Sequence, residues 1–229
     1  MTQGSEGGAA EVVGELYTPG EVGPFYDELA LTYQQGFAKP PWREVSKCVD
    51  PGRFQRCVGG FSALAVGKMC NQCGHRTQEL AYPRDKLVAE WECMAQTYPT
   101  AWYLERFANG GGTTLAALAW CATATEIGAE RYGDVPAMDA WLPRVLGDDK
   151  VMWLDDVFAN TQLHPTDNLH NFGAFVKGLA EKLDAQTVAY LTIVPAMLHV
   201  AERDFGTAAT VYKREADVPD RRNFVRIKI

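Results

Sequence analysis

Two stretches in the N-terminal half of the chain carry apolar residues at a helical spacing. In residues 25–37 the apolar and aromatic positions recur mostly at intervals that suit an α-helix, and two prolines follow at 40–41. Residues 87–98 repeat the pattern, with their largest apolar side chains on one helical face. Both stretches are therefore predicted to be helices, and the proline pair is predicted to end the first one in a stiff turn.

Continuous apolar runs, separated by polar loops, dominate the second half of the chain. Short apolar runs are typical of buried strands, whereas apolar residues three to four positions apart are typical of helices. The predicted strands are residues 113–124, 151–159, 186–194, 208–213 and 223–229. The predicted helices are residues 173–183 and 196–205. Their order predicts at least one parallel βαβ unit with a right-handed crossover.

Three segments show neither a helical spacing of apolar residues nor a continuous apolar run. Residues 1–14 are small, polar and rich in glycine, so we expect a flexible N-terminus or a poorly ordered strand there. The stretch before residue 151, with Gly133 and two prolines, is expected to form a loop. Residues 45–82 hold four of the six cysteines and many glycines, which predicts an irregular insertion. We therefore expect a single domain over residues 15–229 that carries this Cys-rich insertion.

Composition limits the class of protein. With 229 residues, 47% of them apolar, the chain can bury one substantial core. Its apolar runs are much shorter than the roughly 20 residues that cross a bilayer, so we expect no membrane span and a cytoplasmic protein. The formal net charge of −7 gives no general attraction to phosphate backbones, which disfavours a nucleic-acid partner.

Three stretches resemble the GNAT acyltransferase family. Residues 33–42 (YQQGFAKPPW) are similar to the first helix and turn of that family, and residues 153–159 (WLDDVFA) to the strand beside its cofactor. Residues 201–206 (AERDFG) are similar to the end of its last helix. The resemblance, which leaves out the Cys-rich middle, implies an α/β (α+β) fold with a mixed, splayed central β-sheet flanked by helices on both faces. It also implies an acyl-CoA, with acetyl-CoA expected, as the donor of an acyl group.

The same resemblance implies a CoA-binding loop at residues 168–174 (NLHNFGA). In the family, a glycine-containing turn leads into a helix whose unpaired backbone N–H groups bind the CoA pyrophosphate. Gly173 is the only glycine of that turn here, and Asn168 or His170 supplies its side-chain contact. The implied residues are Phe158 and Ala159 for the pantetheine arm, and Asn168, His170, Asn171, Phe172, Gly173 and Ala174 for the phosphates.

Direct transfer to an amine needs a base, and three carboxylates are candidates. Asp155 and Asp156 are adjacent on a predicted strand, so alternation predicts that only one of them faces the acceptor cleft, and which one stays open. A salt bridge is the alternative role for either. Glu126, just past the preceding strand, is the second candidate base. The last predicted helix has no tyrosine to protonate the leaving thiolate, and His199 is its alternative acid.

Four cysteines of the insertion have a metal-binding pattern. Cys70 and Cys73 have the CxxC spacing that turns two thiolates toward one ion. Cys48 and Cys57 upstream would complete a tetrahedral four-thiolate site, and His75 is the alternative fourth ligand. We therefore predict a structural zinc that folds the insertion, while a redox pair and ordinary free thiols remain alternatives.

The remaining cysteines and several aromatic residues are assigned to the core. Cys93 and Cys121 fall on a predicted helix and a predicted strand, where a free thiol packs as a small apolar group. Four aromatic residues either belong to the core or line an acceptor cleft beside the insertion: Trp91, Tyr98, Trp102 and Tyr103.

These features predict an acyl-CoA-dependent N-acyltransferase that transfers directly, in a ternary complex, to a small-molecule or peptide amine. The single glycine of the CoA loop leaves open a GNAT-fold binding module without CoA chemistry. A nucleic-acid-modifying enzyme, with the insertion as its reading element, is a third alternative. The acceptor and the oligomeric state stay open, and a homodimer is compatible with the fold.

Overall fold

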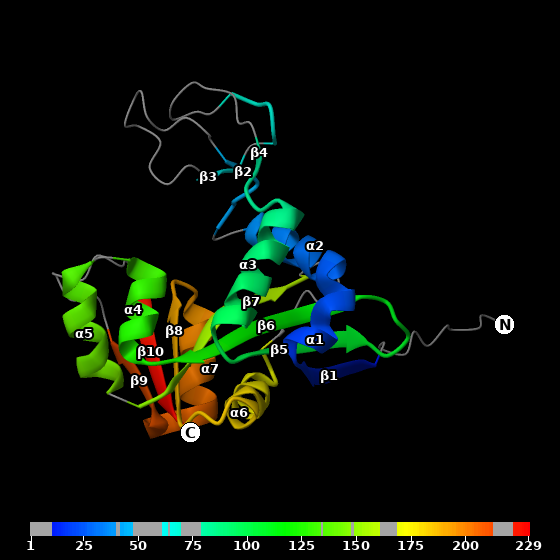
Figure 1. Ribbon diagram of the computed structural model, residues 1–229. Helices are drawn as coiled ribbons and strands as arrows, with labels where there is room; N and C mark the ends of the chain where they lie inside the picture. The colour runs from blue at the N-terminus through cyan, green and yellow to red at the C-terminus, as the bar shows by residue number, and fades with distance from the viewer. Residues whose placement is uncertain are drawn as a thin grey trace.

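The computed structural model contains a seven-stranded sheet at its centre (Figure 1). The strand order is β1-β5-β6-β7-β8-β10-β9, and every neighbouring pair is antiparallel except β7 and β8, which are parallel. The strands are β1 (Val12–Tyr17), β5 (Thr100–Phe107), β6 (Thr113–Ala122), β7 (Val151–Ala159), β8 (Thr187–Thr192), β9 (Ala209–Tyr212) and β10 (Asn223–Lys228). The structure describes residues 11–39, 42–47, 61–63, 65–69, 79–133, 135–147, 149–160, 169–212 and 222–229.

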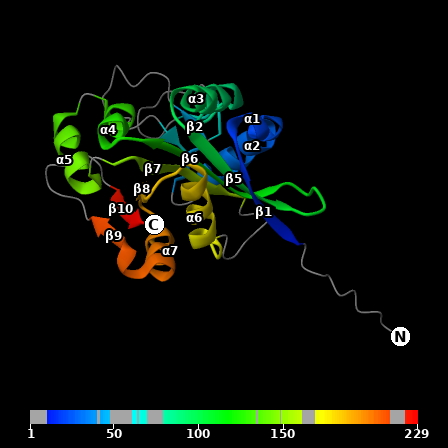
Figure 2. The ribbon, with the colours of Figure 1, turned by 60° about the horizontal axis from the view of Figure 1, so that its bottom comes forward.

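Helices cover both faces of this sheet (Figures 1 and 2). The helices are α1 (Pro19–Val22), α2 (Tyr26–Phe37), α3 (Arg84–Thr97), α4 (Ala124–Tyr132), α5 (Pro136–Leu146), α6 (Phe172–Lys182) and α7 (Pro195–Phe205), with 3-10 turns at Gly23–Phe25 and Gly206–Ala208. Side chains of α2 and α3 pack on one face against β5, β6 and β7, and those of α4 and α5 cover the same face toward β8 and β10. Side chains of α6 and α7 pack on the opposite face.

A second, small sheet lies beyond the ends of α2 and α3 (Figure 1). Its strands are β2 (Ser46–Lys47), β3 (Phe61–Ser62) and β4 (Glu79–Leu80), in the order β3-β2-β4. They belong to the segment 45–82, which the sequence predicts as an irregular insertion. The four cysteines of that segment lie outside the described residues.

Strand β6 is buried along its whole length, as its apolar run predicts. Ala117, Ala119 and Cys121 pack in the cluster beneath α6 and α7. Ala116 and Leu118, on the other side of the strand, pack beneath α2 and α3. Because both faces of β6 are covered by helices, the strand is apolar at almost every position rather than at every second one.

The structure confirms the predicted strands of the second half of the chain and the helices α2, α3, α6 and α7, with ends that differ by at most three residues. It also confirms the parallel βαβ unit, since α6 connects β7 to the parallel strand β8. The prediction of a loop before residue 151 is wrong, because α4 and α5 occupy most of it.

The loop prediction failed because glycine and proline stand at helix ends in this segment. Gly133 has φ of 58° and caps the C-terminus of α4, and Pro136 occupies the first turn of α5. Both positions suit these residues, since glycine adopts positive φ and proline needs no N–H partner at a helix start. Pro143 does lie inside α5, where its neighbours Trp141 and Leu142 are buried against the sheet.

The edge strand β1 begins at Val12, inside the segment 1–14 that was expected to be flexible or poorly ordered. It pairs antiparallel with β5, and Gly14 lies beside Tyr103. A Cβ atom at position 14 would overlap with the Tyr103 hydroxyl, so glycine is needed here to make room for the Tyr103 side chain.

The prediction that Cys93 belongs to the core is also wrong. Cys121 is buried in β6, but Cys93 is exposed because the buried side of α3 is formed by Leu87, Trp91 and Met94. Within the described residues, no helix combines the length and the apolar character that a membrane span needs.

Candidate active site

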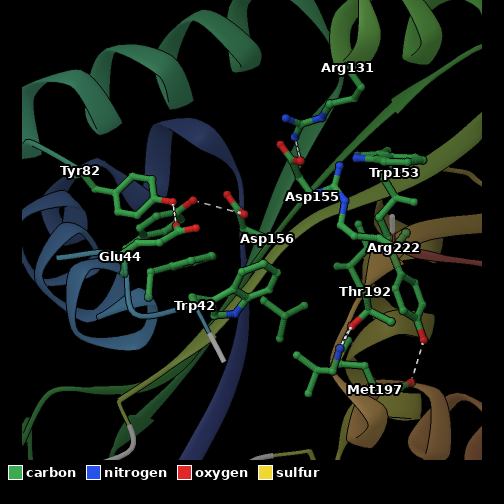
Figure 3. Close-up of a pocket in the computed structure, with 17 residues that line it drawn as sticks. Trp42, Glu44, Tyr82, Arg131, Trp153, Asp155, Asp156, Thr192, Met197 and Arg222 are labelled. Carbon is green, nitrogen blue, oxygen red and sulfur yellow. Dashed lines mark hydrogen bonds and ion pairs between the residues drawn. The ribbon is translucent and has the colours of Figure 1, made fainter. Parts of the chain in front are cut away.

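Strands β7 and β8 separate after a short parallel ladder. The ladder joins Val151 to Thr187, Met152 to Val188 and Trp153 to Ala189. Among the described residues, the rest of β7 has no ladder partner on the side of β8. A pocket of about 360 Å³ lies where the strands separate, lined by α2, the turn after it, Tyr82, both strands, the first turn of α7 and Arg222 (Figure 3).

A β-bulge in β7 places two carboxylates in this pocket. Leu118 of β6 pairs with Asp156, but the next residue, Ala119, pairs with Leu154, so Asp155 is an extra residue in β7. A bulge interrupts the alternation of side chains. Asp155 and Asp156 therefore contact helices on the same face, and the prediction that only one of them can face the cleft is wrong.

Asp155 is held in an ion pair with Arg131 of α4. Its side chain is only 9% exposed, and the Arg131 guanidinium also lies over the Trp120 ring, 5.9 Å from the centroid. The arginine partner stabilises the charged form of this carboxylate and engages its lone pairs. The salt bridge, one of the two roles expected for this aspartate, is therefore observed at Asp155.

Asp156 has a different environment one residue away. The Tyr33 hydroxyl donates a hydrogen bond to its Oδ1 atom over 3.5 Å. Burial raises the pKa of Asp156 to about 6, although the positive charges of Arg131 and Arg222 oppose the shift. A carboxylate with this pKa is ionised at neutral pH and is a stronger base than an exposed aspartate.

A further carboxylate, Glu44, lines the same pocket. The Tyr82 hydroxyl donates a hydrogen bond to Glu44, and burial raises the pKa of both groups. The Tyr82 ring belongs to a group of four aromatic rings that contact one another and line the same pocket: Tyr33, Phe37, Trp42 and Tyr82. Figure 3 shows Trp42, Tyr82 and Glu44 in the pocket. In the sequence, one signal pointed to this carboxylate: Glu44 follows closely on the stretch 33–42 that resembles the family.

No protein-family profile and no curated sequence matches the chain. A mosquito arylalkylamine N-acetyltransferase-like protein, 5b, aligns with a TM-score of 0.54 and 9% identity over 96% of this chain and 100% of its own. The polyamine N-acetyltransferase of Drosophila melanogaster aligns with a TM-score of 0.52 and 10% identity over 96% and 99%. A mutant agmatine N-acetyltransferase in its apo form aligns with a TM-score of 0.50 and 11% identity over 96% and 99%.

The fold is that of the GNAT acetyltransferases. The comparison confirms the predicted fold class, a mixed, splayed sheet with helices on both faces. At identities this low, the likeness concerns the fold alone, and function must be argued from the site.

In this GNAT fold, Phe158 and Ala159 lie on the part of β7 that has separated from β8. The Phe158 side chain is buried beneath α2, with its ring 5.0 Å from that of Tyr33. Within the described residues, the backbone here has a ladder partner on the β6 side only. An extended chain such as a pantetheine arm could pair with this open edge, since unpaired strand edges readily accept a further strand.

The start of α6, the expected phosphate site of the GNAT fold, is already in contact with a carboxylate. The Gly173 N–H donates a hydrogen bond of 2.7 Å to Asp204 Oδ2 at the end of α7. Arg203 donates hydrogen bonds to the carbonyls of Leu169 and His170, which ties the preceding turn to α7. Asp204 thus occupies a position where the unpaired amides of a helix start favour an anion.

The other residues expected in the phosphate loop lie as follows. Asn168 lies outside the described residues. Phe172 is fully buried in the core, so only its backbone is available to a ligand. The Asn171 side chain contacts the His170 ring over 2.8 Å, and Ala174 lies in the first turn of α6.

Glu126 does not line the pocket, because it caps α4. The backbone and hydroxyl of Thr123 both donate hydrogen bonds to the Glu126 carboxylate over 2.8 Å, and the Glu126 N–H donates back to the Thr123 hydroxyl. These hydrogen bonds lower the pKa of Glu126, which weakens it as a base.

Several further candidates fall outside the pocket. His199 is exposed on α7. Trp91, Trp102 and Tyr103 are buried core residues, and Tyr98 is partly buried; none of the four lines the pocket. The core alternative therefore holds for these aromatic residues.

The predicted zinc ligands Cys48, Cys57, Cys70 and Cys73 lie outside the described residues, as does His75. The described residues contain no cluster of three or more metal-ligating side chains. The described part of the chain thus gives the zinc site no support, and the site stays a prediction.

Proposed function

We propose that the protein is an acyl-CoA-dependent N-acyltransferase that acetylates a small amine in a ternary complex. One observation carries the proposal: Asp156, a partly buried carboxylate whose desolvation raises its pKa to about 6, lies where β7 and β8 separate. A base of this strength next to an open strand edge suits the transfer of an acyl group to an amine. The acetylation of agmatine and of polyamines by proteins of the same fold supports a small-molecule amine as the acceptor.

In this proposal, acetyl-CoA would supply the acetyl carbon that forms the new C–N bond as its C–S bond breaks. Asp156 removes the proton from the acceptor's ammonium group, so that the nitrogen lone pair can attack. Asp155 and Arg131 hold the bulge of β7, which keeps Asp156 directed into the pocket. The open edge of β7 around Phe158 and Ala159 binds the donor's arm, and its N–H groups polarise the reacting carbonyl.

Tyr190 is the proposed hydrogen-bond donor to the departing sulfur. It lies on β8, lines the pocket from the side opposite to Asp156, and is 2% exposed. Its hydroxyl donates a hydrogen bond of 3.0 Å to the Met197 carbonyl, which positions it at the start of α7. Burial raises its pKa, so the hydroxyl stays protonated at neutral pH and can stabilise the departing thiolate by donating a hydrogen bond to it. The lack of a tyrosine in α7 itself is thus compensated from the neighbouring strand.

The test is release of free thiol from acetyl-CoA in the presence of a panel of primary amines, with the acetylated product identified by mass spectrometry. The proposal expects product with at least one amine, and loss of that product in Asp156→Asn. Thiol release without an acetylated amine, or unchanged turnover in Asp156→Asn, would overturn it.

A second candidate is a GNAT-fold binding module, which the Asp204 contact favours. Asp204 satisfies the Gly173 amide that the phosphates of CoA would need, and its negative charge opposes them. If this candidate is correct, acetyl-CoA will neither bind in calorimetry nor be consumed, while small cationic ligands will still bind in the pocket.

A further inference from the structure

Besides Asp156, the pocket contains an aromatic cluster and a further carboxylate, Glu44, which the reacting amine does not need. Four aromatic rings form a continuous cluster at one end of the pocket. The Tyr33 and Phe37 rings stack with centroids 4.4 Å apart, the Tyr82 ring lies 5.0 Å from Tyr33, and the Trp42 ring lies 5.5 Å from Phe37. The rings come from α2, the turn after it and the segment before α3, so three parts of the chain converge on this end.

Glu44 lies against these rings as a half-buried carboxylate. Tyr82 donates a hydrogen bond to it, and within the described part of the chain the structure gives Glu44 no ion pair. Of the described arginines, Arg131 and Arg222 line the pocket, and Arg131 is already paired with Asp155. In Figure 3, Arg222 lies on the far side of Asp156 from Glu44. A carboxylate removed from water without a cation is unfavourable, so this end of the pocket favours a positively charged ligand.

Aromatic rings around a carboxylate form a recognised type of cation site. Alkylammonium groups bind to the faces of tryptophan and tyrosine through the ring quadrupole, and a carboxylate adds a charged hydrogen bond. The rings also exclude water, which strengthens both interactions. The polar and apolar parts of this end thus match an alkyl chain that ends in an ammonium group.

The reacting nitrogen needs a different place, beside Asp156. Tyr33 contacts Asp156 and Tyr82 contacts Glu44, so the two carboxylates are fixed by neighbouring tyrosines. The volume of about 360 Å³ leaves room for a small molecule only. A single short ligand can therefore reach both carboxylates.

We propose that the acceptor is a short aliphatic diamine whose second, non-reacting ammonium group binds between Glu44 and the rings of Trp42 and Tyr82. This inference rests on the proposed function for the role of Asp156, and it adds the substrate class. Glu44 and Trp42 are then specificity-determining residues, which bind the substrate and take no part in proton transfer.

A matched pair of acceptors tests the inference. 1,4-Diaminobutane and n-butylamine have the same chain length and differ in the second nitrogen. We expect kcat/KM with acetyl-CoA to be at least about tenfold higher for the diamine. Glu44→Gln should remove most of this preference by raising KM for the diamine about tenfold or more, with kcat and the monoamine kinetics almost unchanged. Equal kcat/KM values for the two amines, or an equal loss for both in Glu44→Gln, would overturn the inference.

Controls separate binding from folding. Gln keeps an acceptor for the Tyr82 hydroxyl, so Glu44→Gln should unfold at nearly the wild-type temperature. Glu44→Asp, which keeps the charge, should recover part of the preference, and Trp42→Leu should weaken diamine binding without affecting the monoamine. If Glu44→Gln does not fold, the same assay is made with Trp42→Leu. Loss of the preference for the diamine would then support the inference, and an unchanged preference would reject it.

Calorimetry distinguishes failure of this inference from failure of the proposed function. If no amine is acetylated, titration with 1,4-diaminobutane alone still reports the cation site, and its binding should be lost in Glu44→Gln. Binding that depends on Glu44, without turnover, would leave the inference standing and reject the acyltransferase. Acetylation of n-butylamine as efficient as that of the diamine would reject the inference and keep the enzyme.

Discussion

Asp155 and Asp156 are identical, adjacent residues with different chemistry. One extra residue in β7 turns both side chains toward the same face, where Asp155 meets Arg131 and Asp156 meets the Tyr33 hydroxyl. Asp155 is thereby engaged in an ion pair, whereas burial raises the pKa of Asp156. The different roles of the two residues follow from the register between β6 and β7.

The proposed base should be visible in the pH dependence of activity. Because burial raises the pKa of Asp156 to about 6, kcat/KM should rise about tenfold per pH unit below this value and level off above it, once ionisation of the free amine is corrected for. Asp156→Asn should lower kcat about 10²- to 10⁴-fold and remove this inflection. A wild-type profile without an inflection between pH 5 and 7, measured as initial rates, would contradict the assignment.

The same pKa predicts an effect on stability. The pKa of Asp156 is higher in the folded protein than the ~3.9 of an unfolded aspartate, so the folded state binds more protons between about pH 4 and 6. Stability contributed by this group is therefore lost as the pH rises through that window. Asp156→Asn should raise the midpoint of thermal unfolding by roughly 3–8 °C at pH 8 and have little effect at pH 4.

Asp155→Asn provides the control for that experiment. It leaves the partly buried Arg131 without its partner, so it should lower stability by roughly 1–3 kcal/mol at pH 8. If both variants are destabilised equally at pH 8, Asp156 does not carry the raised pKa.

The sequence reveals the candidate site at the residue scale only in part. Asp155 and Asp156 could be identified because they lie in a local stretch, 153–159, that resembles a family pattern. Their orientation could not, since the bulge depends on pairing with β6. Tyr82 and Arg131 were missed because they reach the pocket from elements distant in sequence, and no local pattern marks such convergence.

At the scale of elements, the contact between α6 and α7 decides how the protein can bind an acyl-CoA. Asp204 accepts the Gly173 N–H, and Arg203 holds the turn before α6. Hydrogen bonds from Arg203 lower the pKa of Asp204, so its negative charge is present throughout the physiological range. A phosphate group at the start of α6 would have to displace this carboxylate or bind beside it.

Removal of this charge should therefore strengthen CoA binding. In Asp204→Asn we expect the Kd for acetyl-CoA, measured by calorimetry, to fall about two- to tenfold, the scale of a charge at a helix end. Glu202→Gln is the matched control, since it removes the same charge from an exposed position of α7 without contacting α6. Weaker binding in Asp204→Asn would show instead that Asp204 orders the turn that receives the phosphates.

Element prediction succeeded where one physical signal dominated. The apolar run of β6 identified a strand covered on both faces, and the spacing in residues 25–37 identified α2. It failed at α5, because Pro136 and Pro143 led to the prediction of a loop although the segment also contains the apolar residues that the helix buries. Proline is compatible with a helix start, and packing against the sheet outweighs the unfavourable proline inside it.

At the scale of the whole molecule, the sheet consists of two parts joined by a short ladder. β1, β5, β6 and β7 form one part, and β8, β10 and β9 form the other. Within the described part of the chain, only the residues from Val151 to Trp153 of β7 pair across the junction. The resemblance implied this splay, but local periodicity could not, since strand separation depends on residues far apart along the chain.

A ligand that bridges the two parts should stabilise the whole protein. Acetyl-CoA at 100 times its Kd should add about 2.7 kcal/mol by mass action, which raises the midpoint of thermal unfolding by roughly 5–10 °C for a chain of this size. Pantetheine should give part of this shift if the open edge of β7 supplies most of the binding, and adenosine 3′,5′-bisphosphate should give almost none while Asp204 occupies the start of α6. If adenosine 3′,5′-bisphosphate gave a larger shift than pantetheine, the main contacts with the acyl donor would lie at the start of α6. No shift with any of the three would remove the acyl donor from the proposal, because a ligand that binds the folded state must stabilise it.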